Sequence, residues 1–268
     1  MQNEESSRTL TLQVTNYKQY LMDEEDGTRA ATSIDTLENL ALAVFDGTTG
    51  ELKQGIIKQK KGDKGYGTYS VTLPYGNYQL TIVGFNGTHP LKTFTANEIA
   101  FEDGYVPHTF LCNKDLTVNA ETSDNQSITL KRAVAAFRLI MLDKIPDDVA
   151  SMKIQASNGG AALNPKTGFS TTNTGSTYTY SITLSKGQEG KSVTNYLFVP
   201  ANPTVVTYTV TALDSKDAIV RQRKFEHVPM QVNYRTTYKG EFFAADNMNG
   251  KMQLMVDMDW AGENEYEY

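Results

Sequence analysis

The stretch Ile128–Leu142, ITLKRAVAAFRLIML, decides the fold that this sequence predicts. It follows the polar segment ETSDNQ (residues 121–126) and is almost entirely apolar from Ala133 onward. Its alanines, leucines and methionine favour a helix, but ITLK alternates between apolar and polar residues as a strand does. A strand that is covered on both faces also reads as a continuous apolar run. We therefore predict a doubly covered strand that opens a second domain after a joint near Asp124.

The sequence on either side of this stretch has the alternation and the turns of short strands. Leu10, Leu12 and Val14 alternate with threonines and Gln13, as a strand with one buried face requires. Further on, two apolar segments flank the Gly- and Asp-containing turn at residues 46–50, which predicts a hairpin. Turn signals recur about every ten residues, which is typical of a β-sandwich or barrel.

These patterns predict an all-β chain in three parts. Residues 1–34 hold the N-terminal strand and an exposed loop, which contains the acidic run Asp23–Asp26 followed by Arg29 and Ala30. Residues 35–124 form a first β-sandwich, which the strand at residues 9–15 completes. Residues 125–268 form a second β-sandwich. Its last predicted strand has one apolar face, made of Met252, Leu254, Val256, Met258 and Trp260.

Composition argues against several classes of function. The net charge of −6 and the pI of about 5.2 disfavour a nucleic-acid or acidic-membrane partner. The lysines between residues 58 and 64 are therefore interpreted as the solvated end of a hairpin. The single cysteine, Cys112, excludes an intramolecular disulfide and is expected to be a buried small hydrophobe.

No spacing of residues in the chain predicts a catalytic, metal or cofactor site. The three histidines, at positions 89, 108 and 227, are far apart and lack a second ligand at i+3 or i+4. The segment GDKGYG (Gly62–Gly67) lacks the Gly-Lys-Ser/Thr ending of a phosphate loop, and we expect a hairpin loop there. We therefore predict a protein that is not an enzyme and has no cofactor.

Three stretches together resemble the fimbrillin family, the subunits of type V fimbriae of Bacteroidales bacteria. Leu130–Ile154 resembles the segment that opens the second domain of that family. Val228–Phe243 resembles its near-terminal strand, Leu40–Leu52 resembles its first hairpin, and the closing strand with Trp260 fits its ending. The resemblance covers the whole chain in order.

The resemblance implies two tandem transthyretin-like (Greek-key) β-sandwich domains. It also implies export as a lipoprotein to the outer membrane or the fimbrium, with a lipidated cysteine upstream of this sequence. In polymerising members an Arg-specific, trypsin-like protease cuts the loop after the first strand, which here points to the Arg29–Ala30 bond. The strand carrying Leu10, Leu12 and Val14 would then be removable, and another subunit would fill the groove.

The resemblance does not decide between two roles for the C-terminal strand. It has the pattern of a donor that fills the groove of a neighbouring subunit, and equally that of a fixed strand of the second domain. The leading expectation is a fimbrial subunit that contributes to adhesion, with other subunits and a host or bacterial surface ligand as partners.

Two other classes of function compete with this one. The first is a surface glycan-binding lipoprotein that does not polymerise, in which exposed aromatics such as Tyr66, Tyr75 and Tyr178 stack on sugars. The weakest is a hydrolase that uses a pair of carboxylates. The candidate pairs are Asp147 with Asp148, Glu102 with Asp103, and Asp257 with Asp259.

Overall fold

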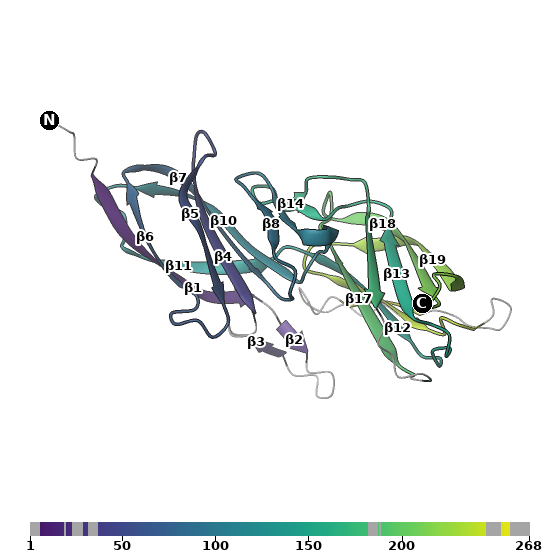
Figure 1. The fold of residues 1–268 in the computed structure, drawn as a ribbon. Helices are drawn as coiled ribbons and strands as arrows, with labels where there is room; N and C mark the ends of the chain where they lie inside the picture. Colours follow the sequence, from purple (N-terminus) through teal and green to yellow (C-terminus); the bar gives the residue numbers. More distant parts are fainter. Residues whose placement is uncertain are drawn as a thin grey trace. The chain divides into compact units, whose positions relative to one another are not determined.

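The computed structural model describes residues 6–18, 20–22, 29–31, 37–181, 187, 189–244 and 253–257. Within these residues, the backbone alone is described at 16–18, 20–22, 29–31, 178–181 and 253–257. The described chain is built of strands and one short 3-10 helix, Glu102–Gly104 (Figure 1). This confirms the predicted all-β class. Among the described residues, no helix has the length and hydropathy needed to span a membrane.

The strands of the first half of the chain are β1 (Ser7–Lys18), β2 (Tyr20–Met22), β3 (Arg29–Ala31), β4 (Asn39–Asp46), β5 (Leu52–Lys60), β6 (Thr68–Pro74), β7 (Gly76–Phe85), β8 (Leu91–Phe94), β9 (Ile99–Phe101), β10 (Thr109–Val118) and β11 (Asn125–Arg132). Those of the second half are β12 (Ala135–Met141), β13 (Ser151–Ala156), β14 (Ala162–Asn164), β15 (Phe169–Ser170), β16 (Ser176–Ser181), β17 (Lys191–Leu197), β18 (Thr204–Leu213), β19 (Ile219–Met230), β20 (Arg235–Gly240) and β21 (Gln253–Asp257).

The chain divides into two compact units. The first unit comprises Met1–Glu102, Pro107–Ala133 and Leu163–Gly168, and the second comprises Asp103–Val106, Val134–Ala162 and Phe169–Tyr268. Each unit has its own buried apolar cluster, so each has the core that an independent domain requires.

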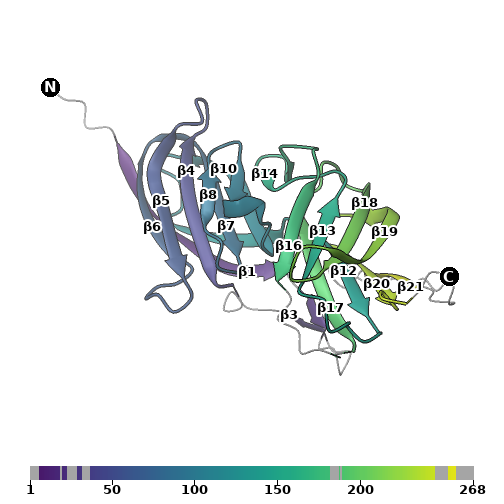
Figure 2. The same cartoon turned by 45° about the vertical axis from the view of Figure 1, so that its right-hand side comes forward.

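Besides β2, β3, β8 and β9, which lie in smaller sheets, the first unit has one seven-stranded sheet, folded so that its two parts enclose the core. Its strand order is β5-β4-β7-β10-β11-β1-β6. β10 and β11 are joined at two residue pairs, Phe110 with Arg132 and Leu111 with Lys131. The sheet folds over at this junction, because buried side chains of β4 and β7 share one cluster with those of β1, β6 and β11. The two layers are visible in Figure 2.

The second unit is a sandwich of two four-stranded sheets. Their strand orders are β17-β12-β20-β21 and β16-β13-β18-β19. The side chains between them form one apolar cluster centred on Phe137 of β12, whose ring stacks on that of Tyr208 at a centroid distance of 4.2 Å. Stacked aromatic pairs of this kind contribute beyond the area that they bury.

The two units share one arrangement of strands. In the first unit β1 lies between the antiparallel β6 and the parallel β11. In the second unit β12 lies between the antiparallel β17 and the parallel β20 in the same way. The opposite layers also correspond, as β5-β4-β7-β10 and β16-β13-β18-β19. The prediction of two similar successive halves therefore has a topological counterpart, whereas the specific transthyretin-like assignment stays a prediction.

The stretch Ile128–Leu142 is extended, as predicted, but it is two strands and not one. β11 ends at Arg132, and β12 begins at Ala135 in the other unit. Arg132 is buried, donates from Nε to Nε2 of His108 at 2.8 Å and lies over the ring of Phe110. These contacts hold the end of β11 in the first unit. The division therefore falls between Ala133 and Val134, after the predicted joint near Asp124, because β11 pairs with β1.

Of the two hairpins predicted in the first unit, one is present and the other is not. Residues 46–50 connect the paired strands β4 and β5, as predicted. The backbone N–H groups of Thr49 and Thr48, with Lys53 nearby, lower the pKa of Asp46 to about 2. The Gly62–Gly67 segment is a loop but no hairpin, because β5 and β6, which it connects, lie at opposite ends of the sheet.

Candidate assembly site

The N-terminal strand β1 lies inside the sheet of the first unit, between β6 and β11. Leu10, Leu12 and Val14 are 0%, 0% and 4% exposed, which confirms the buried face predicted from their alternation. Leu12 lies opposite Tyr69 of β6 on one side and Gln126 of β11 on the other. The strands β6 and β11 therefore form a slot in the sheet, and β1 fills this slot by pairing with both of them.

The hydrogen-bond ladders on both sides of β1 define what its removal would leave behind. Seven residues of β1 are in register with β6 and seven with β11. Without β1, β6 and β11 would both present unpaired backbone groups beside their own core side chains, among them Val71 and Ile128. An open edge of this kind is a template for another strand.

Polar contacts at the two ends of β1 fix its register. Nε of Arg8 donates to Oδ1 of Asp124 at 2.6 Å, and the same side chain also donates to the carbonyl of Ala120. Near the other end, the hydroxyls of Thr15 and Ser127 are 2.8 Å apart. A slip by one residue would place the threonines of β1 in the core, so the slot selects a strand by its alternation.

Tyr69 brings a polar group into the core beside β1. Its hydroxyl is buried and has no hydrogen-bond partner among the described residues. Burial raises the pKa of Tyr69. A buried donor without a partner costs about 1–3 kcal/mol.

Arg29 and Ala30 lie in β3, which is antiparallel to β2. The sequence predicts an exposed loop here. The backbone of these two residues instead belongs to a two-stranded ribbon, so the prediction of a loop is wrong. Two isolated strands are marginally stable in water, so such a ribbon opens at low cost. Their side chains lie outside the described residues, and cleavage at this bond stays a prediction.

The C-terminal strand β21 is antiparallel to β20 and is the terminal strand of its sheet. Leu254 lies opposite Tyr238, and Val256 opposite Thr236. The other three residues of the predicted apolar face, Met252, Met258 and Trp260, lie outside the described residues. In this structure β21 is a strand of the second unit, and its donation to another subunit stays a prediction.

A set of side chains clamps the chain just before it leaves toward β21. The carboxylate of Asp143 accepts hydrogen bonds from the backbone N–H groups of Phe242, Phe243 and Ala244, at 3.0, 2.5 and 3.1 Å. Nε of Arg223 donates to the carbonyl of Phe242 at 2.7 Å. This clamp joins positions about 100 residues apart, and local sequence patterns carry no signal for it.

Replacing Asp143 with alanine should lower the free energy of unfolding of the second unit by about 3 kcal/mol, because three N–H groups lose a charged acceptor. Urea denaturation would measure this loss, and hydrogen exchange should speed up at the amides of Phe243 and Ala244. Asp147→Ala is the matched control, because Asp147 is exposed, and it should change stability by less than about 0.5 kcal/mol. Equal stabilities of the two variants would contradict the clamp.

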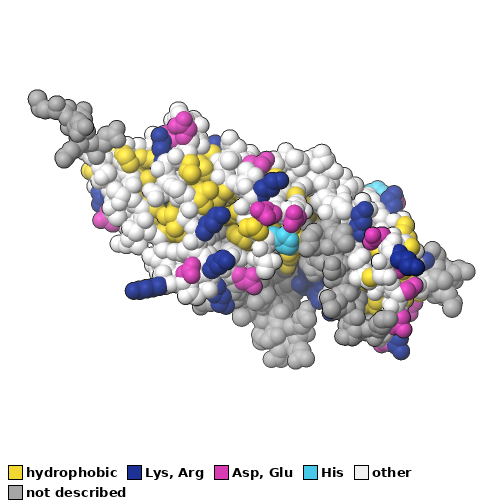
Figure 3. All heavy atoms as spheres, viewed as in Figure 1, with side chains coloured by type: hydrophobic (Ala, Val, Ile, Leu, Met, Phe, Trp, Pro, Cys, Tyr) yellow, Lys and Arg dark blue, Asp and Glu magenta, His cyan; other side chains and the backbone are white. Residues whose placement is uncertain are grey.

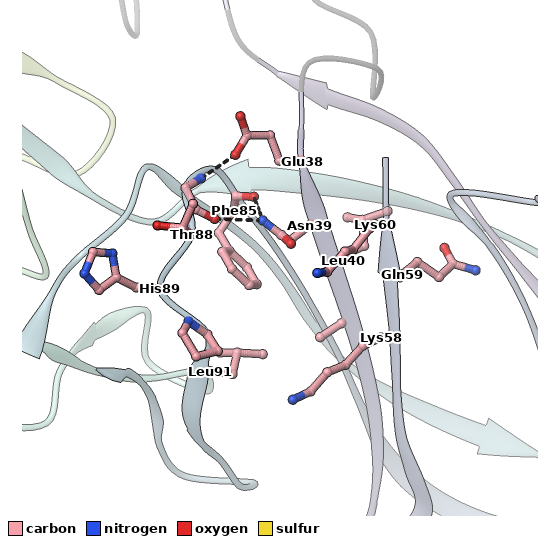
Figure 4. Close-up of a pocket in the computed structure, with 13 residues that line it drawn as sticks. Glu38, Asn39, Leu40, Lys58, Gln59, Lys60, Phe85, Thr88, His89 and Leu91 are labelled. Carbon is pink, nitrogen blue, oxygen red and sulfur yellow. Dashed lines mark hydrogen bonds between the residues drawn. The ribbon is translucent and has the colours of Figure 1, made fainter. Parts of the chain in front are cut away.

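Described residues of the first unit line two of its surface pockets. One, of about 370 Å³, lies beside β4, β5 and the segment that leads into β8 (Figure 4). The other, of about 620 Å³, lies at the turn between β6 and β7 and is lined by Tyr75, Asp46 and Lys53 among others. Each pocket is lined by a single carboxylate, Glu38 in the first and Asp46 in the second, so neither pocket supports the acid-pair hydrolase.

The three tyrosines predicted to stack on sugars have different environments. Tyr75 is 44% exposed and is available for such a contact. Tyr66 is not, because it packs against the core and its hydroxyl donates to the carbonyl of Leu37 at 2.7 Å. The side chain of Tyr178 lies outside the described residues.

Three other groups of chemically reactive side chains can be followed among the described residues. Within the described part of the chain, no cluster of three or more His, Cys, Asp and Glu residues could hold a metal ion. Cys112 is half-buried against the core of the first unit, and burial raises the pKa of its thiol. Asp147 and Asp148 are exposed turn residues.

Several solved structures have a fold similar to that of this chain. A structure described as a "putative adhesin" from Bacteroides ovatus is 15% identical, with a TM-score of 0.55 over 96% of this chain and 94% of that one. "Putative polysaccharide binding proteins (DUF1812)" from Bacteroides thetaiotaomicron are 12% identical, with a TM-score of 0.56 over 94% and 96%. The fimbrial anchor protein Mfa2 from Porphyromonas gingivalis is 12% identical, with a TM-score of 0.46 over 94% and 97%.

The chain belongs to the family of unknown function DUF6562, whose model matches residues 106–268. No curated protein matches the sequence. At these identities the structural similarities establish the fold alone.

Proposed function

We propose that this protein is a cell-surface fimbrial subunit that assembles when β1 is exchanged for a strand of a neighbouring subunit. The burial of β1 between β6 and β11 is the observation that carries the proposal. Each of its three core side chains contributes roughly 1.5–3 kcal/mol on burial. A replacement strand would recover that burial together with two hydrogen-bond ladders, which is strand addition used for assembly.

The proposal includes partners and a location. The partners are other fimbrial subunits, an Arg-specific trypsin-like protease that cuts between Arg29 and Ala30, and a ligand on a host or bacterial surface. The location is the outer membrane or the fimbrium, reached as a lipoprotein. The adhesin descriptions of the structural neighbours support a surface role in general terms.

The first cut by an arginine-specific protease should fall after Arg29, because β3 pairs with a single short strand whereas most other arginines lie in larger sheets. Intact-mass spectrometry over a time course would locate the cut. Arg29→Gln should remove this cleavage. Arg8→Gln is the matched control and should leave it unchanged, since Arg8 lies within β1. A first cut elsewhere would contradict the processing step.

A second candidate function is a surface glycan-binding protein that does not polymerise. The exposed Tyr75 and the pocket beside β5 favour it. The two functions are compatible, because adhesion by a fimbrial subunit itself requires a ligand site.

A further inference from the structure

The pocket beside β5 lies on the outer face of the first unit's sheet, the face opposite the core. Lys58 pairs with Ala41 and Lys60 with Asn39, so these four side chains share one face. Residues 85–91, at the end of β7 and the start of β8, form the opposite wall. Figure 3 shows hydrophobic side chains on the exposed surface of this unit, with side chains of both charges among them.

Two ammonium groups give this pocket a local positive charge on an acidic protein. Lys58 and Lys60 are both exposed, and neither forms an ion pair with a described residue. Two residues of a strand span roughly 6.6 Å, so both ammonium groups can reach one anionic group. In Figure 4 both side chains extend from β5 toward Phe85 and Leu91.

The wall opposite the lysines is fixed by hydrogen bonds before any ligand arrives. Oε2 of Glu38 accepts the backbone N–H of Gly87 at 2.6 Å. Nδ2 of Asn39 donates to the carbonyl of Gly87 at 3.1 Å, and the backbone N–H of Glu38 donates to Oδ1 of Asn86 at 3.0 Å. A wall ordered in advance reduces the entropy that binding must overcome.

The pocket combines an apolar surface with polar groups around it. Phe85, Pro90 and Leu91 supply the apolar surface, and the hydroxyl of Thr88 and the carboxylate of Glu38 lie at its rim. Its volume of about 370 Å³ is within the range of small-molecule sites, roughly 300–1,000 Å³. A ligand that fits this pattern has an anionic group, an apolar face and hydroxyls.

We propose that this pocket binds a carboxylated sugar residue of a surface glycan. The carboxylate lies between Lys58 and Lys60, the C–H face of the ring packs on Leu91 and Pro90, and ring hydroxyls reach Thr88 and Glu38. The inference deepens the adhesive part of the proposed function by naming its ligand class. It does not depend on the exchange of β1.

The test is a titration of the uncut, 15N-labelled chain with D-glucuronate, followed by amide chemical shifts. Glucuronate should bind with millimolar affinity and shift the resonances of Lys58, Lys60, Gly87 and Leu91. D-glucose lacks the carboxylate and acetate lacks the sugar ring. Each should bind at least roughly ten-fold more weakly than glucuronate, because each loses one or two charge-assisted or packing contacts. Added salt should weaken the binding of glucuronate.

Variants assign the effect to the two lysines. The double variant Lys58→Gln, Lys60→Gln should bind glucuronate at least about ten-fold more weakly with an unchanged thermal melt, since both side chains are exposed. The control Lys61→Gln removes a neighbouring charge that does not line the pocket and should bind as the original chain does.

Three results would overturn the proposal. Equal binding of glucose and glucuronate would remove the role of the carboxylate, and equal binding of acetate would leave a simple anion site. Undiminished binding by the folded double variant would place the ligand elsewhere. The measurement uses uncut monomer, so its failure leaves strand exchange untouched, and a failure of strand exchange leaves this site untouched.

Discussion

Replacing Leu12 with alanine should lower the free energy of unfolding of the first unit by about 2–5 kcal/mol. Leu12 is fully buried, and it lies at the centre of β1 between β6 and β11. The loss combines the transfer free energy of the removed methyl groups with the cost of a cavity, which the two hydrogen-bonded neighbouring strands cannot close. Urea denaturation, with hydrogen exchange to separate the two units, would measure it.

Gln13→Ala is the matched control for this experiment. Gln13 is the next residue of β1 and is exposed, so its loss should change stability by less than about 0.5 kcal/mol. Equal effects of the two substitutions would mean that β1 contributes little to the core. The slot would then have no affinity for a replacement strand, and the proposed assembly would lose its driving force.

Replacing Phe137 with alanine should destabilise the second unit by about 3–5 kcal/mol. Its ring is fully buried, stacks on Tyr208 at 4.2 Å and meets Phe225 edge-on at 5.5 Å. β12 lies between β17 and β20, so the cavity would lie in the middle of the sandwich.

The comparison for Phe137 is a substitution on the same strand whose side chain is only partly buried. Ile140→Val should cost no more than about 1 kcal/mol. Thermal melts of both variants with hydrogen exchange would assign the losses to the second unit. A Phe137→Ala variant that melts with the original chain would contradict the account of this core.

Local alternation was sufficient to predict much of β1. A period of two residues places Leu10, Leu12 and Val14 on one face, and burial of that face follows from the hydrophobic effect alone. Which strands flank β1 depends on pairs between residues more than fifty and more than a hundred positions apart. No local pattern contains that information.

The apolar run Ile128–Leu142 shows why the domain joint was misplaced. An apolar run identifies burial, but two strands buried in two different cores produce the same run as one strand buried on both faces. The break at Ala133 and Val134 has no glycine or proline to mark it. The pairing of β11 with β1 and the contacts of Arg132 with His108 and Phe110 keep the residues before the break in the first unit, and these are partners distant in sequence.

The candidate ligand site was missed for a related reason. The lysines of β5 were interpreted as a solvated hairpin end, and Lys58 and Lys60 are indeed exposed. Their relation to residues 85–91 depends on the pairing of β4 with both β5 and β7. The sequence therefore predicts that both lysines are exposed, but the pairing of the strands is needed to show that they face residues 85–91.

Native mass spectrometry of the chain after cleavage at the Arg29–Ala30 bond tests the exchange of β1 most directly. We predict a series of oligomers whose mass increases by the mass of residues 30–268, with the fragment that contains β1 released. Monomers that keep this fragment bound after prolonged incubation at high protein concentration would contradict the account. In that case β1 would be a permanent strand of the first unit.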